Sequence, residues 1–302
     1  MTRHKSLVIS QSLFLALLSL LAAEHGCGLS SWRVLLFAVL GANGIYLVRY
    51  FKNASARVPL SGISVIINSL LLAWELASVT YKTANPILLP PPAEVFQVFE
   101  SCAPLMLRGV VSSLALLGFA MAAALSLGVL TGLFIGRTPV LCGIFLPIAK
   151  VLSPIPPIIY SPYAVAVMPT FKSAAALIIT LGIFWPVSMN IINRVSGMDK
   201  RIINSAKALG ITHMGMVYKI LLPYLLPGII KSLHVTLSTS FLLLTMAEMM
   251  GASSGLGYFI KNYADYANYT NVIAGIILIG IVITALNMAV TEAEKKFIKW
   301  TE

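Results

Sequence analysis

The sequence predicts an all-α integral membrane protein with about eight transmembrane helices. Residues of the set AVILMFWYC make up 58% of the chain and charged residues only 10%, whereas soluble domains are about 25% charged. The apolar residues also gather into blocks of roughly the 20 residues that a helix needs to cross a bilayer. Eight such blocks follow one another, at 7–23, 32–50, 63–81, 110–135, 141–168, 174–192, 225–251 and 272–290.

The basic residues predict that both termini are cytoplasmic. With the N-terminus inside, the inner side receives fourteen of these residues and the outer side five: inside Arg3, Lys5, Arg49, Lys52, Arg57, Arg137, Arg194, Lys200, Arg201, Lys207, Lys219, Lys295, Lys296 and Lys299, outside Arg33, Lys82, Arg108, Lys172 and Lys261. Such an excess is typical of cytoplasmic loops. The net charge of +11 therefore indicates topology, and we expect a lipid membrane and no nucleic acid as a partner.

The first two blocks, within residues 1–62, predict an extra N-terminal transmembrane hairpin. The first block follows Arg3 and Lys5 and ends in Ala22 and Ala23, a pattern shared by cleaved signal peptides and retained helices. We favour a retained helix, because further apolar blocks follow directly.

Residues 63–108 hold the third block and a segment expected outside the cytoplasm. The proline run at 90–92 ends any helix. Apolar residues then alternate with polar ones (Glu94, Val95, Phe96, Gln97, Val98, Phe99). The pattern predicts a short helix on the outer membrane surface, and an ordinary loop is the alternative.

The fourth block carries Gly128, Gly132 and Gly136. A spacing of four places all three on one helix face, where a second helix can approach closely. This stripe predicts helix packing and no chemistry.

The fifth block contains Pro147, Pro154, Pro156, Pro157 and Pro162. Each interior proline removes a backbone hydrogen bond, and broken backbone at membrane depth is tolerated where protein or a wet cavity surrounds it. We therefore expect this block to face the interior beside a pathway, to which its polar side chains Lys150, Tyr160 and Tyr163 contribute.

Further polar residues within apolar blocks are candidates for a pathway or gate. Charged side chains inside a membrane usually face a cavity or a partner. Glu248, just before a glycine-rich break, is a gate candidate, and Asn190 in the sixth block is a pathway candidate. Lys150 either lines the pathway or reaches the inner interface, Lys231 is expected to snorkel to that interface, and Glu75 is left open.

Cysteines and histidines indicate no catalytic or metal site. Cys27 and Cys102 are expected outside and can pair only in an oxidising compartment, whereas Cys142 lies near the inner face. We favour three free cysteines. His4, His25, His213 and His234 are scattered, without an HExxH motif or a nucleophile–base pair.

The segment 204–223 is semi-polar although apolar blocks flank it. Asn204 and Ser205 predict a helix start, and Gly210 predicts its end. The apolar residues Ile211, Met214, Val217 and Leu221 then recur at helical spacing, before Pro223 marks entry to the next span. The segment therefore predicts a short cytoplasmic helix with a glycine elbow.

The spacing Ala206, Gly210, nine residues and then Ile220, Leu221, Leu222, Pro223 resembles the cytoplasmic EAA signature of ATP-binding cassette (ABC) importer permeases. The chain from about residue 89 to 290 resembles their nitrate/sulfonate/taurine/bicarbonate branch, in stretches such as LPPPAEVF, PIPPIIYSPY, FWPVSMNII and AEMMGASSGLGYFI. Asn204 and Ser205 depart from the signature, where the family has glutamate and alanine, and the first two spans lie outside the pattern.

The resemblance implies a type I ABC importer permease core at 109–292 in a bacterial cytoplasmic membrane, followed by a basic cytoplasmic tail at 293–302. It implies as partners two ATPase subunits, a second permease copy or paralogue, and an extracytoplasmic substrate-binding protein. Small residues of the coupling helix would fit a groove of the ATPase; its coupling set is Asn204, Ser205, Ala206, Lys207, Gly210, Ile220, Leu222 and Pro223.

No phosphate-binding GxxxxGK[ST] loop occurs in the chain. We therefore expect no cofactor on this chain and place ATP and Mg²⁺ on the partner ATPase. An ion-gradient-driven secondary transporter and an intramembrane enzyme are the alternatives. The basic residues favour a small anion such as a sulfonate, nitrate or bicarbonate, and the tyrosines a heteroaromatic vitamin precursor.

Overall fold

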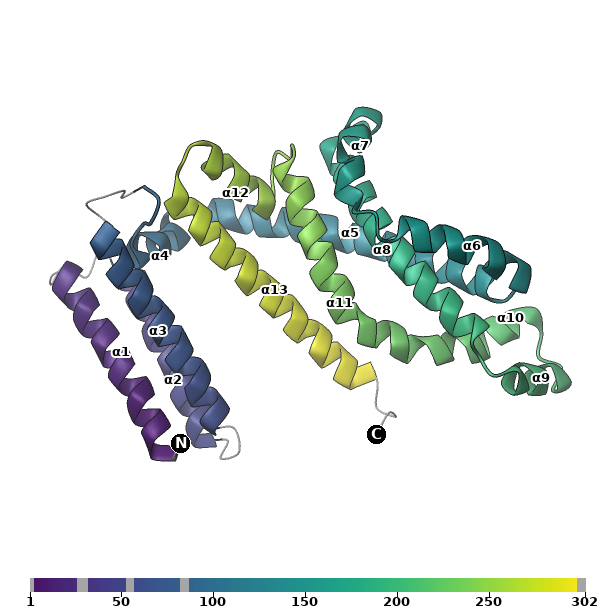
Figure 1. Cartoon of the computed structure of the whole chain (residues 1–302), viewed down its shortest axis with the longest axis horizontal. Helices are drawn as coiled ribbons and strands as arrows, with labels where there is room; N and C mark the ends of the chain where they lie inside the picture. The colour runs from purple at the N-terminus through teal and green to yellow at the C-terminus, as the bar shows by residue number, and fades with distance from the viewer. Residues whose placement is uncertain (1–2, 26–31, 53–56, 82–86, 298–302) are drawn as a thin grey trace. The chain divides into compact units, whose positions relative to one another are not determined.

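The computed structural model describes residues 3–25, 32–52, 57–81 and 87–297, and their regular structure is helical throughout. Cys27, Lys82, Lys299 and the end of the basic tail lie outside the described residues. In chain order (Figure 1) the elements are α1 Arg3–His25, α2 Arg33–Lys52, α3 Arg57–Tyr81, α4 Pro92–Ser101, α5 Ala103–Gly136, α6 Pro139–Leu152, η2 Pro157–Tyr160, α7 Ser161–Val167, α8 Phe171–Ser196, α9 Lys200–Ala208, α10 His213–Met216, η3 Val217–Leu221, α11 Leu222–Met249, α12 Leu256–Asp265 and α13 Tyr269–Phe297.

The expected number of membrane crossings is confirmed. Within the described ranges, seven helical stretches are long and apolar enough to span a bilayer, and α6 with α7 forms an eighth, broken span. Several spans are longer than their apolar blocks, α5 and α3 at their first residues most clearly. α5 begins at Ala103 instead of residue 110 and reaches 34 residues, about 50 Å at 1.5 Å per residue, and α3 begins at Arg57 instead of residue 63.

The proline-rich block is not one straight helix. α6 ends at Leu152, a 3₁₀ turn follows at Pro157–Tyr160, and the two halves are bent by 81°. Pro147 and Pro162 remain inside or at the start of helices, so the break lies where Pro154, Pro156 and Pro157 cluster, because each lacks an amide hydrogen.

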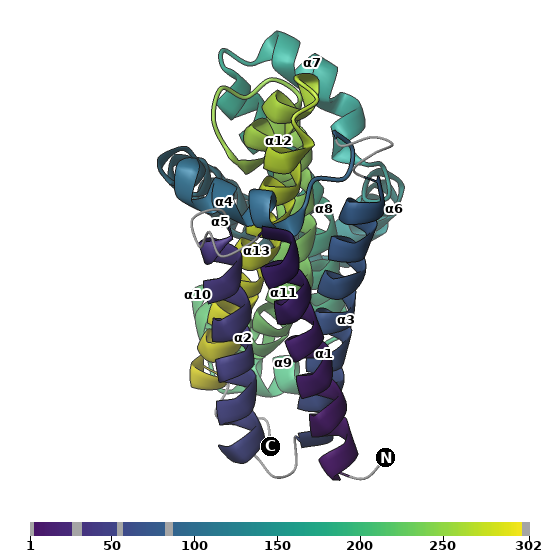
Figure 2. The same cartoon turned by 90° about the vertical axis from the view of Figure 1, so that its left-hand side faces the viewer.

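One compact unit comprises Met1–Leu107 and Ile260–Ile277. Here α1, α2 and α3 run side by side in both views (Figures 1 and 2), and α4 packs on α2 and α3. An apolar core from α1, α2 and α4 joins them, with Leu17, Leu21, Leu35, Val39 and Ala93 buried. The helix expected after the prolines is thus present as α4. The N-terminal hairpin packs directly on α3.

Polar contacts also cross this first unit. Ser10 and Ser64 share a hydroxyl hydrogen bond of 2.8 Å, and the side-chain amide of Gln11 donates to Asn43 at 3.0 Å. Trp74 Nε1 donates to the carbonyl of Pro90 at 3.0 Å, which ties the segment before α4 to α3. Glu75 is fully buried on α3.

The second compact unit comprises Arg108–Phe259 and Leu278–Glu302. α8 packs against α6, α7 and α11. Its main apolar core draws on five helices, with Leu117, Ile179, Phe241, Leu256 and Val282 among its buried members.

The glycine stripe of α5 faces a ridge of β-branched residues on α8. A Cβ added at Gly128, Gly132 or Gly136 would lie 2.8, 2.6 or 2.7 Å from an atom of Val187, Ile191 or Val195 respectively. Both sets repeat every four residues, so the missing side chains of one helix receive the side chains of the other.

Candidate coupling segment and pathway residues

The helix of the candidate coupling segment, α9, begins earlier than predicted. Asp199 is its N-cap, and the Asp199 carboxylate accepts a hydrogen bond of 2.8 Å from the Arg201 amide. Asn204 and Ser205 therefore lie inside the helix, and the prediction that they cap its start is wrong. Asp199 is an equally good capping residue, and it occupies the first position after the turn that ends α8.

The helix ends at Gly210 as predicted, in a cap made of two backbone hydrogen bonds. Gly210 donates to the carbonyl of Lys207 at 3.0 Å, and Ile211 donates to that of Ala206 at 3.1 Å. This pairing requires a left-handed residue between the helix and Ile211, and Gly210 has φ +68°. The space around Gly210 is open, so its backbone conformation, and no close neighbour within this chain, explains the glycine.

α9 has two faces of different character. Arg201, Asn204, Ser205 and Ala208 are exposed on one side, and Leu209 beyond them is 79% exposed. On the other side Ala206 is 3% exposed and packs in a core with Met216, Leu221 and Leu225.

Ala206 is therefore small because its own chain surrounds it. Ala206 therefore packs inside its own chain, where the sequence analysis expected it to fit a groove of a partner. Asn204 and Ser205 remain exposed. Lys207 is exposed but lies beside the internal face, where it lines a cavity.

The helix after the glycine continues without a break into the next span. Thr212 caps α10 by accepting a bond of 3.2 Å from the Gly215 amide, and a π-helical turn at Val217–Leu221 leads into α11. Pro223 lies in the first turn of α11, as expected for a residue that marks entry to the next span. Such π-helical turns are rare and occur mostly as single turns within α-helical runs.

The predicted apolar face of this segment is partly corrected. Leu221 is 2% exposed, but Met214 is 70% exposed and Met216 is buried in its place. Ile220, Leu222 and Pro223 are half-buried.

The structure does not gather the predicted pathway residues into one site. Lys150 and Lys231 are exposed on α6 and α11, and Tyr160 and Tyr163 are 38% and 78% exposed beyond the break. Asn190 lines a small cavity of about 160 Å³ with Ser232 and Thr236, among other residues of α5, α8 and α11. The Asn190 side-chain oxygen accepts from Arg194 Nε at 2.7 Å.

Glu248, the gate candidate, is 1% exposed and bonded within its own unit. One carboxylate oxygen accepts from the Ser113 hydroxyl at 2.6 Å, and the other accepts from the Gly257 amide at 2.8 Å. The Ser113 oxygen accepts in turn from the Leu256 amide at 2.8 Å. The carboxylate thereby satisfies the N-terminus of α12, where an anion is favoured.

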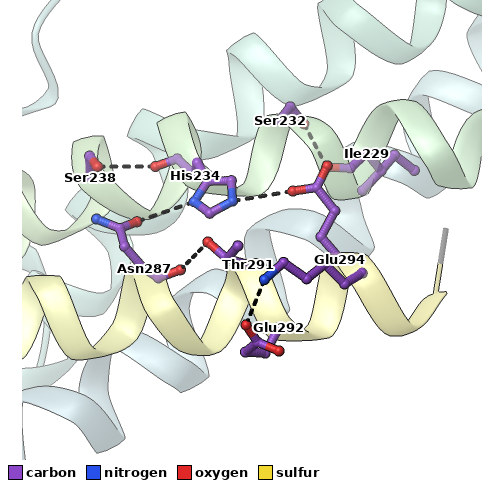
Figure 3. A network of polar contacts seen from close by, with 9 residues as sticks. Ile229, Ser232, His234, Ser238, Asn287, Thr291, Glu292 and Glu294 are labelled. Carbon is purple, nitrogen blue, oxygen red and sulfur yellow. Dashed lines mark hydrogen bonds and ion pairs between the residues drawn. The ribbon is translucent and has the colours of Figure 1, made fainter. Parts of the chain in front are cut away.

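A polar network between α11 and α13 was missed from the sequence. His234 Nε2 lies 3.3 Å from the Glu294 carboxylate and Nδ1 lies 3.5 Å from the Asn287 side-chain oxygen (Figure 3). The sequence shows these residues as isolated polar positions on two helices. Only the arrangement of α11 against α13 brings them together.

The described residues contain no group of three or more His, Cys, Asp or Glu side chains placed to hold a metal ion. Cys102 is half-buried and Cys142 buried, both as free thiols. Cys27, the possible disulfide partner of Cys102, lies outside the described residues.

Comparisons with known proteins agree with the helical architecture. The family model described as "Binding-protein-dependent transport system inner membrane component" matches residues 124–293, more than half of the chain. The taurine transport system permease protein TauC of Escherichia coli (strain K12) is 28% identical over 82% of this chain and 91% of its own length. The bicarbonate transport system permease protein CmpB of Synechocystis sp. (strain PCC 6803) is 25% identical over 84% and 93%.

A solved structure has the same fold. It is titled as inward-facing conformations of the MetNI methionine ABC transporter, and one of its chains aligns with a TM-score of 0.53 and 24% identity over 65% of this chain and 98% of that chain.

The family match and the relatives, together with the apolar spans, show a multi-pass ABC transporter permease of the inner membrane. The chain belongs to the family of binding-protein-dependent transport system inner membrane components, within its nitrate/sulfonate/taurine/bicarbonate branch.

Proposed function

We propose that this chain is the permease subunit of an ATP-driven importer and that the exposed face of α9 receives the force of a separate ATPase. The observation that carries the proposal is the construction of α9: Asp199 and Gly210 fix its two ends, and Asn204 and Ser205 stand exposed between them. A helix held in this way presents a defined surface to a partner.

The internal face of α9 supports a route for the motion. Ala206 packs with Met216, Leu221 and Leu225, and all three belong to the continuous run from α10 into α11. A displacement of α9 would therefore carry α11 with it as a packed body, in the manner of two-state rocking transitions.

The remaining components follow from the family. We infer two permease subunits, two ATPase subunits that hold ATP and Mg²⁺, and an extracytoplasmic binding protein that delivers the solute. The excess of Lys and Arg supports a cytoplasmic position for α9 and both termini.

The substrate that we propose is a small oxyanion or sulfonate. Relatives of this chain are named for taurine, nitrate and bicarbonate transport, and each of these solutes presents an anionic oxygen group. A ligand-shift assay on the binding protein that co-purifies with the chain tests the class directly, with these three solutes, a cationic solute and a heteroaromatic solute as probes. A shift only with a cationic or heteroaromatic solute would contradict it.

The coupling proposal is tested with Ser205→Arg in the purified complex, reconstituted in proteoliposomes with its binding protein. Placing an unpaired charge in a closed interface costs enough to reduce coupled transport more than about tenfold. ATP-driven solute uptake and ATP hydrolysis are both measured. Thr138→Arg is the matched control, because it adds the same charge to an exposed residue outside α9.

Normal uptake by Ser205→Arg would contradict the role of this face. Uptake driven by an ion gradient, from vesicles that hold this chain without an ATPase, would instead favour a secondary transporter.

A further inference from the structure

A partly polar cavity of about 160 Å³ lies between α8 and α11. α8 contributes Pro186 and Asn190 to its wall, and α11 contributes Ser232, Val235 and Thr236. The volume is enough for several water molecules or one small polar solute. All of these residues belong to the second compact unit.

The guanidinium group of Arg194 lies beside this cavity. Its Nε donates to the side-chain oxygen of Asn190 at 2.7 Å. Its terminal nitrogens lie against α11 at Gly228, where an added Cβ would clash with them. Ile229, the next residue, lines the cavity. The bare backbone of Gly228 therefore gives the guanidinium group its place between the two helices.

Most hydrogen-bond donors at this place are unused within the part of the chain that the structure describes. Arginine has five N–H donors, and Arg194 uses one of them, on Asn190. Because the Asn190 oxygen accepts that bond, the Asn190 amide nitrogen still offers its two donors. Both residues are exposed, so a ligand can reach these donors.

The local charge is positive. Lys231 is exposed and lies on the same face of α11 as Gly228 and Val235, because spacings of three and four residues follow the helical turn. Among the described residues, no carboxylate makes an ion pair with Arg194 or Lys231. Like charges on two packed helices repel each other, and a bound anion would offset this repulsion.

We propose that Arg194, Asn190 and Lys231 form a contact site for the small oxyanion that the importer moves. The planar fork of an arginine matches paired anionic oxygens, and the amide of Asn190 adds donors next to it. The inference rests on the proposed function, which supplies the oxyanion. It adds selection inside the permease to the selection made by the binding protein.

The test is anion binding by the purified full-length chain in detergent, measured as the shift of its thermal unfolding midpoint. Sodium methanesulfonate is the probe, and it replaces sodium chloride at constant ionic strength. A ligand that binds the folded state stabilises it in a saturable way, and we expect such saturation. Arg194→Gln should weaken the apparent affinity about tenfold or more, because it removes charge-assisted hydrogen bonds.

Asn190→Asp separates anion binding from a purely structural role. The aspartate keeps the shape of the side chain and an acceptor for Arg194 Nε, but its negative charge repels an anion and pairs with the guanidinium group. We expect a loss of affinity of about tenfold or more. Wild-type affinity in this variant would show that the two residues only join α8 to α11, and it would overturn the proposal. The variant also covers the case in which Arg194→Gln does not fold.

The matched control is Arg49→Gln. Arg49 and Arg194 are both exposed cations in the last turn of a spanning helix, but Arg49 belongs to α2 in the first unit. The control should keep the wild-type affinity for methanesulfonate. Equal losses in Arg49→Gln and Arg194→Gln would indicate general charge attraction and would also overturn the proposal.

Uptake by the reconstituted complex with its binding protein separates this inference from the proposed function. The probes are taurine, nitrate and bicarbonate, and Asn190→Asp should lower the ATP-driven uptake rate about fivefold or more. If wild type and Asn190→Asp import equally fast, the contact site is wrong and the importer stands. If wild type imports none of the three with ATP, the proposed function fails, and the methanesulfonate titration still decides whether the anion site exists.

Discussion

At the scale of single residues, Glu248 illustrates how a buried acid is held in an apolar protein. The sequence marks this residue because an acid within an apolar block is costly. It does not reveal the partners, since Ser113 lies 135 residues away in the chain. The geometry favours a structural clamp between α5, the end of α11 and the start of α12.

Replacing Ser113 by alanine should weaken this clamp. The change leaves a Glu248 oxygen and the Leu256 amide without their buried hydroxyl partner, at a cost of about 1–3 kcal/mol. The measurement is the unfolding free energy of the purified protein in detergent.

Ser112→Ala is the control for this change. Ser112 shares a half-buried hydrogen bond of 2.9 Å with Ser254, and its loss should cost about 1 kcal/mol or less. Equal effects of the two substitutions would show that the Glu248 network contributes nothing particular to stability.

At the scale of helices, the glycine stripe of α5 shows what spacing can and cannot predict. The repeat of four predicts a close helix contact from the sequence alone. The partner helix follows only from the structure, in which Val187, Ile191 and Val195 of α8 fill the stripe.

Gly132→Ala should force α5 and α8 apart. The added Cβ would lie 2.6 Å from Ile191 Cβ, and overpacking of this kind costs about 1–3 kcal/mol. The unfolding free energy in detergent measures the loss.

Gly118→Ala on the same helix serves as the comparison, because nothing lies within 4 Å of a Cβ at Gly118. It should be neutral or slightly stabilising, since alanine favours helix more than glycine does. If both variants lose the same stability, the contact with α8 is not the cause.

At the scale of the whole molecule, the distribution of basic residues predicts the orientation. A single cysteine at Ser205 should react with a membrane-impermeant maleimide only after permeabilisation of spheroplasts, in a chain whose three native cysteines are replaced. A cysteine at Tyr266, which is 77% exposed between α12 and α13, should react in intact spheroplasts. The reverse pattern would refute the orientation.

The coupling segment contains one feature that can be predicted from the sequence and one that only the structure shows. The end of the helix at Gly210 can be predicted from the sequence, because few residues other than glycine adopt the left-handed conformation needed there. The choice of Asp199 over Asn204 as the N-cap cannot be predicted from the sequence, since both are good caps; in the structure Asp199 caps the helix and Asn204 lies inside it.

The sequence by itself determined the membrane character, the number of spans, the proline break and the family, because each depends on composition or on short-range spacing along the chain. Only the tertiary structure decided the partners of Glu248 and His234 and the internal position of Ala206. Those features join residues far apart in sequence, and their energies depend on which helix faces which, a relation that local periodicity does not encode.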